Sequence, residues 1–286
     1  MEYHFSDRIS NVRPSAIREI LKYAASHPEV IALSTGSPAN EAVPVEEISE
    51  ISARIFKEKP LAGLQYSMTE GYPPLRASTK ERLKKEFGIG RDFDDLIITT
   101  GGQQGLSLTP NVFCNPGDTV VVELPTFVSG INAMRIHGAN VVGVEMDEEG
   151  MELDGLEHAF RTEPNVKLLY VIPTFQNPSG KTMSLARRKA IYALCVKYGV
   201  MILEDNPYGE LRFRGEDIPT FKSMDDEGIV IYNGSYSKVL SAGMRIGFVM
   251  AQKDVLQRLT VAKQFSDCHS NIFFQIVTDE WLRTAD

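Results

Sequence analysis

The sequence is poor in cysteine, and its three cysteines lie far apart. Because Cys114, Cys195 and Cys268 are odd in number and widely separated, they form neither a disulfide framework nor a C-x-x-C metal motif. This usage is typical of a reducing compartment, so we expect a cytoplasmic protein without a metal site. The N-terminal residues also lack the apolar core of a signal peptide.

Long apolar runs and an excess of basic residues are missing as well. The longest runs, such as 168–173, have the length of a strand and fall far short of the roughly 20 residues that span a membrane. Thirty Lys and Arg residues stand against 38 Asp and Glu residues, a net charge of −8. We therefore expect neither a membrane nor a nucleic acid as the main partner, although a local basic pocket for a phosphate is compatible with this charge.

What the sequence does contain, from residue 95 onward, is a series of short apolar runs rich in Val and Ile. They cover residues 96–99, 119–123, 141–144, 167–172, 200–203, 229–232 and 245–250. Strands of this kind with helices between them are typical of a mainly parallel sheet covered on both faces. We predict an α/β domain with a seven-stranded sheet. Helices are expected before it, near 15–21, 45–57 and 74–87.

Polar residues follow several of these strands directly. The clusters are 100–104, 125–127, 177–180, 205–208 and 235–238. Open α/β sheets bind ligands beyond the C-terminal ends of their strands, so these clusters are candidates for a site. Taken singly, each has a plain structural explanation: Asn-Pro-Ser-Gly is a common turn, and a strand-end Asp is more often a helix cap.

Taken together, the clusters contain the groups that pyridoxal phosphate needs. Within segment 235–247, Ser235 and Ser237 supply two hydroxyls, Lys238 an amine and Arg245 a guanidinium. Hydroxyl groups, an arginine guanidinium and the backbone N–H groups at the N-terminus of a helix can together bind a phosphate. An amine forms an imine with a carbonyl, and a carboxylate at another strand end can hold a protonated ring nitrogen.

The sequence resembles the fold-type I, class I/II aminotransferases, most closely their 2-aminoadipate/kynurenine branch. Four segments carry the resemblance in the family's order and spacing: LQYSMTEGYPPLR at 64–76, IPTFQNPSG at 172–180, LEDNPY at 203–208 and GSYSK at 234–238. The resemblance extends from about residue 13 to the end of the chain. It implies the large domain of that fold, pyridoxal 5'-phosphate as cofactor, and transamination between an amino acid and a 2-oxo acid.

The resemblance also implies roles for individual residues. Lys238 matches the Schiff-base lysine, and Asp205 matches the carboxylate on the ring nitrogen. The other cofactor contacts that it implies are Tyr208 and Asn177 on the phenolic oxygen, Phe127 on the ring face, and Ser235, Ser237, Arg245 and the N–H groups of Gly102 and Gln103 on the phosphate.

Three further residues match positions that concern the partner subunit and the substrate. Tyr66 matches a tyrosine that reaches the phosphate of the neighbouring subunit, which implies a homodimer. Gly36, together with Asn177, matches a position at the substrate's carboxylate. Arg18 matches an arginine that meets the distal carboxylate of an acidic substrate. Aminoadipate or glutamate with 2-oxoglutarate, or aromatic donors, fit this resemblance.

We expect the chain to divide into an N-terminal helix and arm, residues 1–45, and a PLP-binding large domain, residues 46–286. The sequence stops at 281–286, inside an expected helix. The resemblance therefore implies that the family's C-terminal small domain, with its arginine for the substrate α-carboxylate, is absent from this chain. Two other interpretations stay open: a PLP-dependent lyase, and a truncated, non-catalytic PLP-binding fragment.

Overall fold

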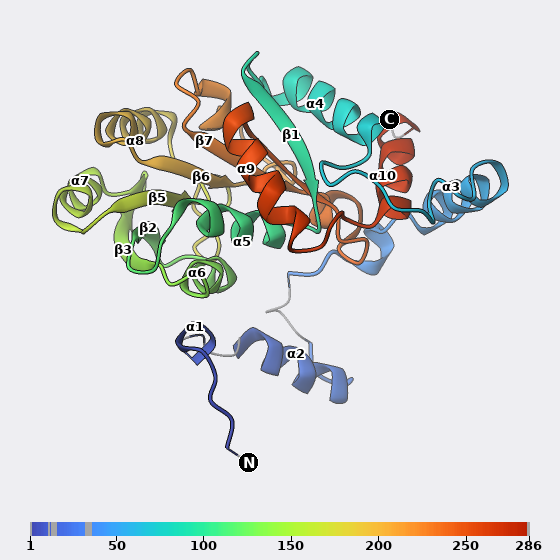
Figure 1. Cartoon of the computed structure of the whole chain (residues 1–286), viewed down its shortest axis with the longest axis horizontal. Helices are drawn as coiled ribbons and strands as arrows, with labels where there is room; N and C mark the ends of the chain where they lie inside the picture. Colours follow the sequence, from blue (N-terminus) through green and yellow to red (C-terminus); the bar gives the residue numbers. More distant parts are fainter. Residues whose placement is uncertain (1, 11, 13–15, 32–35, 285–286) are drawn as a thin grey trace.

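The computed structural model describes residues 2–10, 12, 16–31 and 36–284, and it is built on one sheet with strand order β1-β8-β7-β6-β5-β2-β3-β4 (Figure 1). Its strands are β1 (Asp94–Thr99), β2 (Thr119–Leu124), β3 (Asn140–Asp147), β4 (Gly150–Met151), β5 (Val166–Val171), β6 (Met201–Asp205), β7 (Val230–Ser235) and β8 (Gly247–Gln252). The seven predicted strands are confirmed, and the two-residue β4 is an addition. The run β7-β6-β5-β2-β3 is parallel, whereas β8 is antiparallel to both of its neighbours.

Helices cover both faces of the sheet, as the apolar strands require. They are α1 (Asp7–Ser10), α2 (Ala16–Ser26), α3 (Val45–Glu58), α4 (Pro73–Phe87), α5 (Gly102–Phe113), α6 (Val128–Arg135), α7 (Leu153–Thr162), α8 (Leu185–Tyr198), α9 (Lys253–Gln264) and α10 (Ile272–Thr284). None of these described helices has the length and apolar character to cross a membrane. In the view of Figure 1, α1 and α2 lie beneath the body of the molecule.

Alternate residues of the strands belong to different cores. In β2, Val120 and Val122 pack with α5, α6 and α9, whereas Val121 packs with α7 and α8 on the opposite face. A third cluster joins α3, α4 and α10 to β1, β7 and β8. This alternation follows from the two-residue period of a strand. Burial of both faces explains why the strands are mostly apolar.

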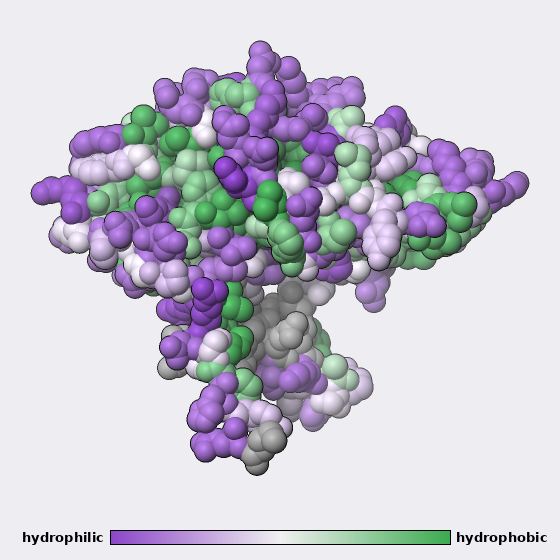
Figure 2. Space-filling view, viewed as in Figure 1, coloured by the Kyte–Doolittle hydropathy of each residue, from purple (hydrophilic) through white to green (hydrophobic). Residues whose placement is uncertain are grey.

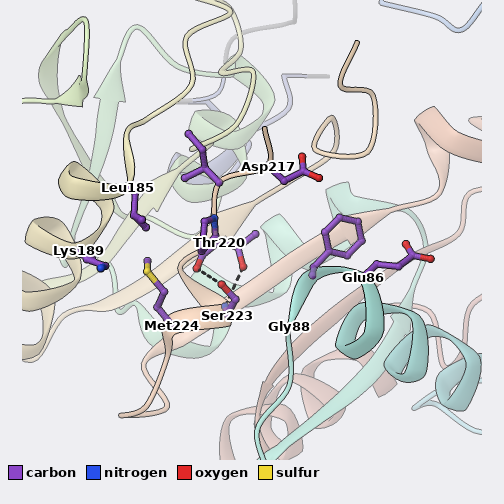
Figure 3. A pocket seen from close by; sticks show the side chains of 11 residues that line it. Glu86, Gly88, Leu185, Lys189, Asp217, Thr220, Ser223 and Met224 are labelled. Atoms are coloured by element: carbon purple, nitrogen blue, oxygen red, sulfur yellow. Dashed lines mark hydrogen bonds between the residues drawn. The ribbon is translucent and has the colours of Figure 1, made fainter. Parts of the chain in front are cut away.

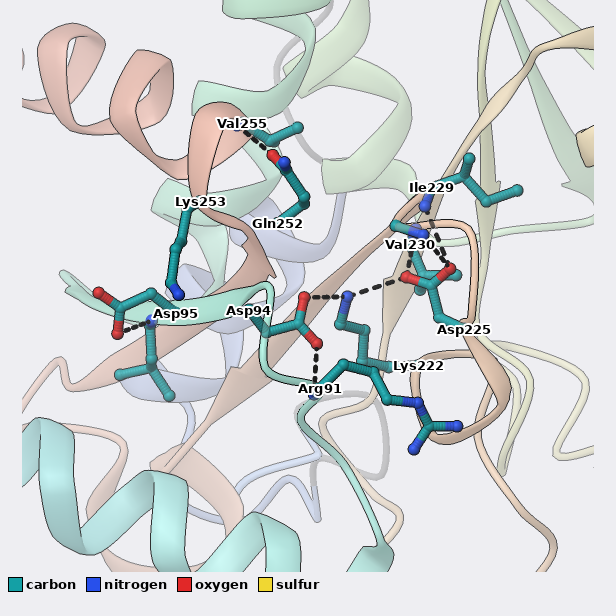
Figure 4. A network of polar contacts seen from close by, with 12 residues as sticks. Arg91, Asp94, Asp95, Lys222, Asp225, Ile229, Val230, Gln252, Lys253 and Val255 are labelled. Carbon is teal, nitrogen blue, oxygen red and sulfur yellow. Dashed lines mark hydrogen bonds and ion pairs between the residues drawn. The ribbon is translucent and has the colours of Figure 1, made fainter.

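A buried ion network fastens the first strand to the middle of the sheet (Figure 4). Lys222, in the short helix η2 (Lys222–Met224), is 0% exposed, and its Nζ lies 2.7 Å from Asp94 Oδ1 and 2.9 Å from Asp225 Oδ2. Asp225 also accepts the backbone N–H groups of residues 228, 229 and 230 at the start of β7. One ammonium group thus compensates two buried carboxylates from distant parts of the chain.

We predict that Lys222→Met lowers the free energy of unfolding by about 3–5 kcal/mol, because two buried carboxylates lose the cation that they share. Urea denaturation measures this loss. Lys80→Met is the matched control: its 2.9 Å pair with Asp95 is partly exposed, and its loss should stay within about 1 kcal/mol. Equal small losses in both variants would contradict the role given to the buried network.

Candidate active site

A cavity of about 1140 Å³ lies at the C-terminal ends of the parallel strands. It brings together residues from all five polar clusters and from the N-terminal arm. Its lining includes Gly36, Gly102, Gln103, Phe127, Asn177, Asp205, Tyr208, Ser235, Ser237, Lys238 and Arg245. Eleven residues singled out by sequence therefore share one cavity.

A smaller cavity, about 540 Å³, lies between the end of α4 and the start of α8 (Figure 3). The hydroxyl groups in its wall are already engaged: Ser223 Oγ donates to the Thr220 carbonyl at 2.8 Å, and Thr220 Oγ1 accepts from Ser223 N. None of the residues predicted for the site lies in its lining. The larger cavity is thus the candidate active site.

Lys238 presents its amine to the cavity from a single π-helical turn, η3 (Ser237–Ser241), directly after β7. Its Nζ donates to the Gly36 carbonyl at 2.6 Å and lies 5.8 Å from the centre of the Tyr208 ring. Burial lowers the pKa of Lys238, because removal from water disfavours the charged form. A lowered pKa increases the fraction of neutral amine, which is the nucleophilic form.

Asp205 ends β6 and is 5% exposed. Its two oxygens have separate donors: Asn233 Nδ2 donates to Oδ1 at 2.8 Å, and the Tyr170 hydroxyl donates to Oδ2 at 3.1 Å. Burial raises the pKa of Asp205 to about 6, although both hydrogen bonds oppose this shift. The result is an oriented carboxylate in the cavity wall that would gain from a nearby cation.

Hydroxyl and guanidinium groups meet at another part of the cavity. Ser235 Oγ donates to Ser237 Oγ at 3.0 Å, and Arg245 Nη1 lies 3.4 Å from the same Ser237 oxygen. Arg245 has a φ of +57°, which is rare outside glycine and typical of constrained functional positions. Gly101 suits this place because its φ of +69° lies in the left-handed region, and a Cβ on it would also displace the Arg245 guanidinium.

Helix α5 begins beside this group, at Gly102. The first N–H groups of a helix have no partner within it and carry its positive end. Together with two hydroxyls and a guanidinium, they form a set of donors suited to a phosphate. Gly102 has no side chain, so it can contribute only its backbone N–H group.

Tyr208 and Asn177 come from two different strand ends and line the same cavity. Burial is the main cause of the raised pKa of Tyr208, and the Asn177 side chain partly offsets it. Phe127 is half-buried at the start of α6 and completes this part of the cavity wall.

One predicted residue, Tyr66, does not line the cavity. Tyr66 is 88% exposed, and its ring contacts His269 with 5.9 Å between centroids. Arg18 lies in α2, and its side chain falls outside the described residues. Sequence reasoning missed Tyr170 and Asn233, which orient Asp205. The sequence feature that could have revealed them is a polar side chain inside an otherwise apolar strand.

Comparisons with known proteins identify the family. The family described as "Aminotransferase class I and II" matches residues 28–284. Aromatic-amino-acid aminotransferase 1 of Thermococcus litoralis is 40% identical over 280 residues, which are 96% of this chain and 67% of that protein. The structure of Pyrococcus horikoshii kynurenine aminotransferase superposes with a TM-score of 0.93 at 37% identity, covering 98% of this chain and 70% of that one.

A third comparison bears on the cofactor. The α-aminoadipate aminotransferase of Thermus thermophilus, in complex with N-(5'-phosphopyridoxyl)-L-leucine, superposes with a TM-score of 0.89 at 38% identity, covering 98% of this chain and 69% of that one. The chain belongs to the class I and II aminotransferases. Its cofactor is pyridoxal phosphate, and its reaction is amino-group transfer between an amino acid and a 2-oxo acid. These findings favour transamination over the lyase alternative.

The buried charge of Asp205 should make the cofactor-free protein less stable as the pH rises. The pKa of this carboxyl is about 6 in the folded chain and near 3.8 ordinarily, so the folded state gains from the proton. That gain is complete below about pH 4 and is lost as the pH rises through 6. We predict that Asp205→Asn is more stable than the wild type by about 1–3 kcal/mol at pH 7.5, and that the difference vanishes near pH 4.

Urea denaturation of both cofactor-free proteins at the two pH values measures this difference. Asp92→Asn, at an exposed position, serves as the control and should show no pH-dependent gain. A stability difference that is the same at both pH values would refute the assignment of a raised pKa to Asp205.

Proposed function

We propose that Lys238 forms the covalent attachment to pyridoxal phosphate. Other residues of the cavity at the strand ends bind the cofactor's ring and phosphate. The observation that carries this proposal is the convergence of a part-buried amine, a buried carboxylate and a cluster of phosphate donors in one cavity. The residues fit the cofactor chemically. Asp205 would hold the ring nitrogen, and Ser235, Ser237, Arg245 and the start of α5 would hold the phosphate.

When bound, pyridoxal phosphate supplies an electron sink conjugated to the substrate Cα. Asp205 keeps the ring nitrogen protonated, because the carboxylate compensates the positive charge. Tyr208 and Asn177 would hydrogen-bond the phenolic oxygen and orient the ring. Phe127 would pack on the ring face and exclude water. The Lys238 amine would move a proton between the substrate Cα and C4′ of the cofactor.

The substrate class follows from the relatives and from the neighbours of Lys238. The named relatives act on aromatic amino acids, α-aminoadipate and kynurenine. This supports an acidic or aromatic amino donor here, with 2-oxoglutarate as acceptor. Gly36 lies beside the Lys238 amine, and its backbone would approach the substrate carboxylate. We keep Arg18 as the proposed contact for a distal carboxylate.

Borohydride reduction of the cofactor-loaded protein should attach the phosphopyridoxyl group to Lys238, as peptide mass spectrometry would show. Lys238→Ala should give no labelled peptide, because it removes the lysine amine that lines the cavity. Lys189→Ala, from the smaller cavity, is the control and should be labelled like the wild type. Addition of aminoadipate, glutamate or an aromatic donor should convert the bound cofactor to its amine form. Labelling at a different lysine would overturn the assignment.

We propose that two copies of the chain form a homodimer with shared sites. Apolar side chains gather at the α3 end of the molecule (Figure 2). Those left exposed in and after α3 are Val45, Phe56, Leu61, Leu64, Tyr66 and Met68. If a second copy covers these side chains, the Tyr66 of each copy would reach the phosphate site of the other copy. We also propose that the large domain begins after residue 45, and the packing of α3 on α10 supports including the rest of α3 in it. The free cysteines support a cytoplasmic location.

The dimer predicts a specific effect for Tyr66. If its hydroxyl bonds the neighbour's phosphate, Tyr66→Phe should raise the Kd for pyridoxal phosphate by about 10-fold, because a hydrogen bond to a charged group is lost. The dimer itself should persist, since the ring remains. Sedimentation of the cofactor-loaded protein and a fluorescence titration measure the two properties. Sedimentation of the loaded wild type as a monomer at micromolar concentration would exclude the shared site.

A further inference from the structure

Glu123 is a buried acid beside the active site that none of the steps above uses. It lies near the end of β2 and is 1% exposed. Its Oε2 accepts two hydrogen bonds, from Ile172 N at 3.0 Å and from Gln176 Nε2 at 3.2 Å. A buried carboxyl with two donors from one neighbouring segment joins β2 to the chain that follows β5.

Gln176 continues this connection, because every polar atom of its carboxamide is engaged. Its Nε2 donates to the Pro125 carbonyl at 2.8 Å as well as to Glu123. Its Oε1 accepts from Ser179 N at 2.9 Å and from Ser179 Oγ at 2.7 Å. The Gln176 backbone bonds to the far side of the same loop, at residues 180 and 181. The carboxamide therefore fixes the loop 176–181 to the end of β2.

The two segments joined in this way carry two of the proposed cofactor contacts. Phe127 follows Pro125 by two residues, and Asn177 follows Gln176 directly. Both line the large cavity, whereas Glu123 and its carboxylate do not. Asn177 also acts on the pKa of Tyr208, which lines the same cavity, so its position affects a third contact. A shift of Gln176 would thus move the ring-stacking group and the donors to the phenolic oxygen together.

The protonation state of Glu123 is compatible with holding these contacts in place. Burial raises its pKa to about 8, and the negative charge of Asp205 adds to the shift. The ionisable groups that act on it or feel its charge are Asp205 from β6, Arg188 from α8 and Tyr170 from β5. At neutral pH the carboxyl is mainly protonated, so it positions its neighbours without adding a second anion next to Asp205.

We propose that Glu123 is a positioning residue of this active site: acting through Gln176, it sets the places of Phe127 and Asn177 around the cofactor ring. The inference rests on the proposed function for the roles of those two residues. It predicts that cofactor binding requires a hydrogen-bond acceptor at residue 123 but does not require a group that can ionise.

The test compares Glu123 with a buried acid that supports a different part of the fold. Glu204 is 0% exposed and lies on β6, and its oxygens accept the backbone N–H groups of Phe221 and Lys222, outside the cavity lining. We would make Glu123→Ala, Glu123→Gln and Glu204→Ala. Three quantities are measured: the Tm of the cofactor-free protein, the Kd for pyridoxal phosphate, and the pH at which the absorbance of the bound cofactor changes.

Both alanine variants should lower the Tm, because each leaves two buried N–H groups without an acceptor. Only Glu123→Ala should also raise the Kd, by about 10-fold, and move the absorbance titration, since it releases contacts to the ring. Glu123→Gln keeps an acceptor oxygen and should stay within about 2-fold of the wild-type Kd. Equal effects of Glu123→Ala and Glu204→Ala on the Kd, or an unmoved titration in Glu123→Ala, would overturn the proposal.

A second variant covers the case in which Glu123→Ala does not fold. Gln176→Asn keeps the carboxamide but is one methylene shorter, so it cannot reach both Glu123 and Ser179. It should reproduce the higher Kd and the moved titration while Glu123 keeps its bond to Ile172. Unchanged values in this variant would overturn the proposal as well. Failure of the wild type to bind the cofactor at Lys238 would instead overturn the proposed function, so the two failures are distinguishable.

Discussion

The register between β6 and β7 is the constraint on which the site depends. It places Asp205 opposite Asn233, so that the amide of one strand bonds the carboxylate of the next. Tyr170 on β5 reaches the other oxygen from the opposite side. A parallel sheet brings the C-terminal ends of successive strands to one edge, and this pairing determines which polar groups meet there. A shift of one residue would turn the carboxylate to the other face of the sheet.

Buried charges serve two different purposes in this molecule. Around Lys222, two carboxylates share one ammonium group, and the network joins β1 to the start of β7. Asp205 is held instead by two neutral donors, and Asn233 Oδ1 is itself buried without a partner among the described residues. Gly105 makes room for that amide, because a Cβ would lie 2.1 Å from the same oxygen. The first arrangement stabilises the fold, whereas the second gives up some stability to keep a carboxylate ready for a cation.

Much of this architecture could be predicted from the sequence, because its signals are local. Strand runs, turn motifs and the segments around Asp205 and Lys238 are each readable within about ten residues. The two-residue β4 escaped prediction because it is too short to show a period. Gln176 escaped for another reason: within its own segment it reads as part of a turn, and its role depends on Glu123, which lies 53 residues away. Residues that act through distant partners carry no local signal.

The reversal of β8 has a consequence for how this protein can vary. Because β7 ends and β8 begins at the same edge of the sheet, the connection 236–246 never leaves the site. It carries both the reactive amine of Lys238 and the guanidinium of Arg245. Loops ordinarily accept insertions more readily than the elements they join. Here an added residue would separate the amine from the anion donors. Variation in length is therefore better tolerated at the opposite edge of the sheet, and this connection has a nearly fixed length.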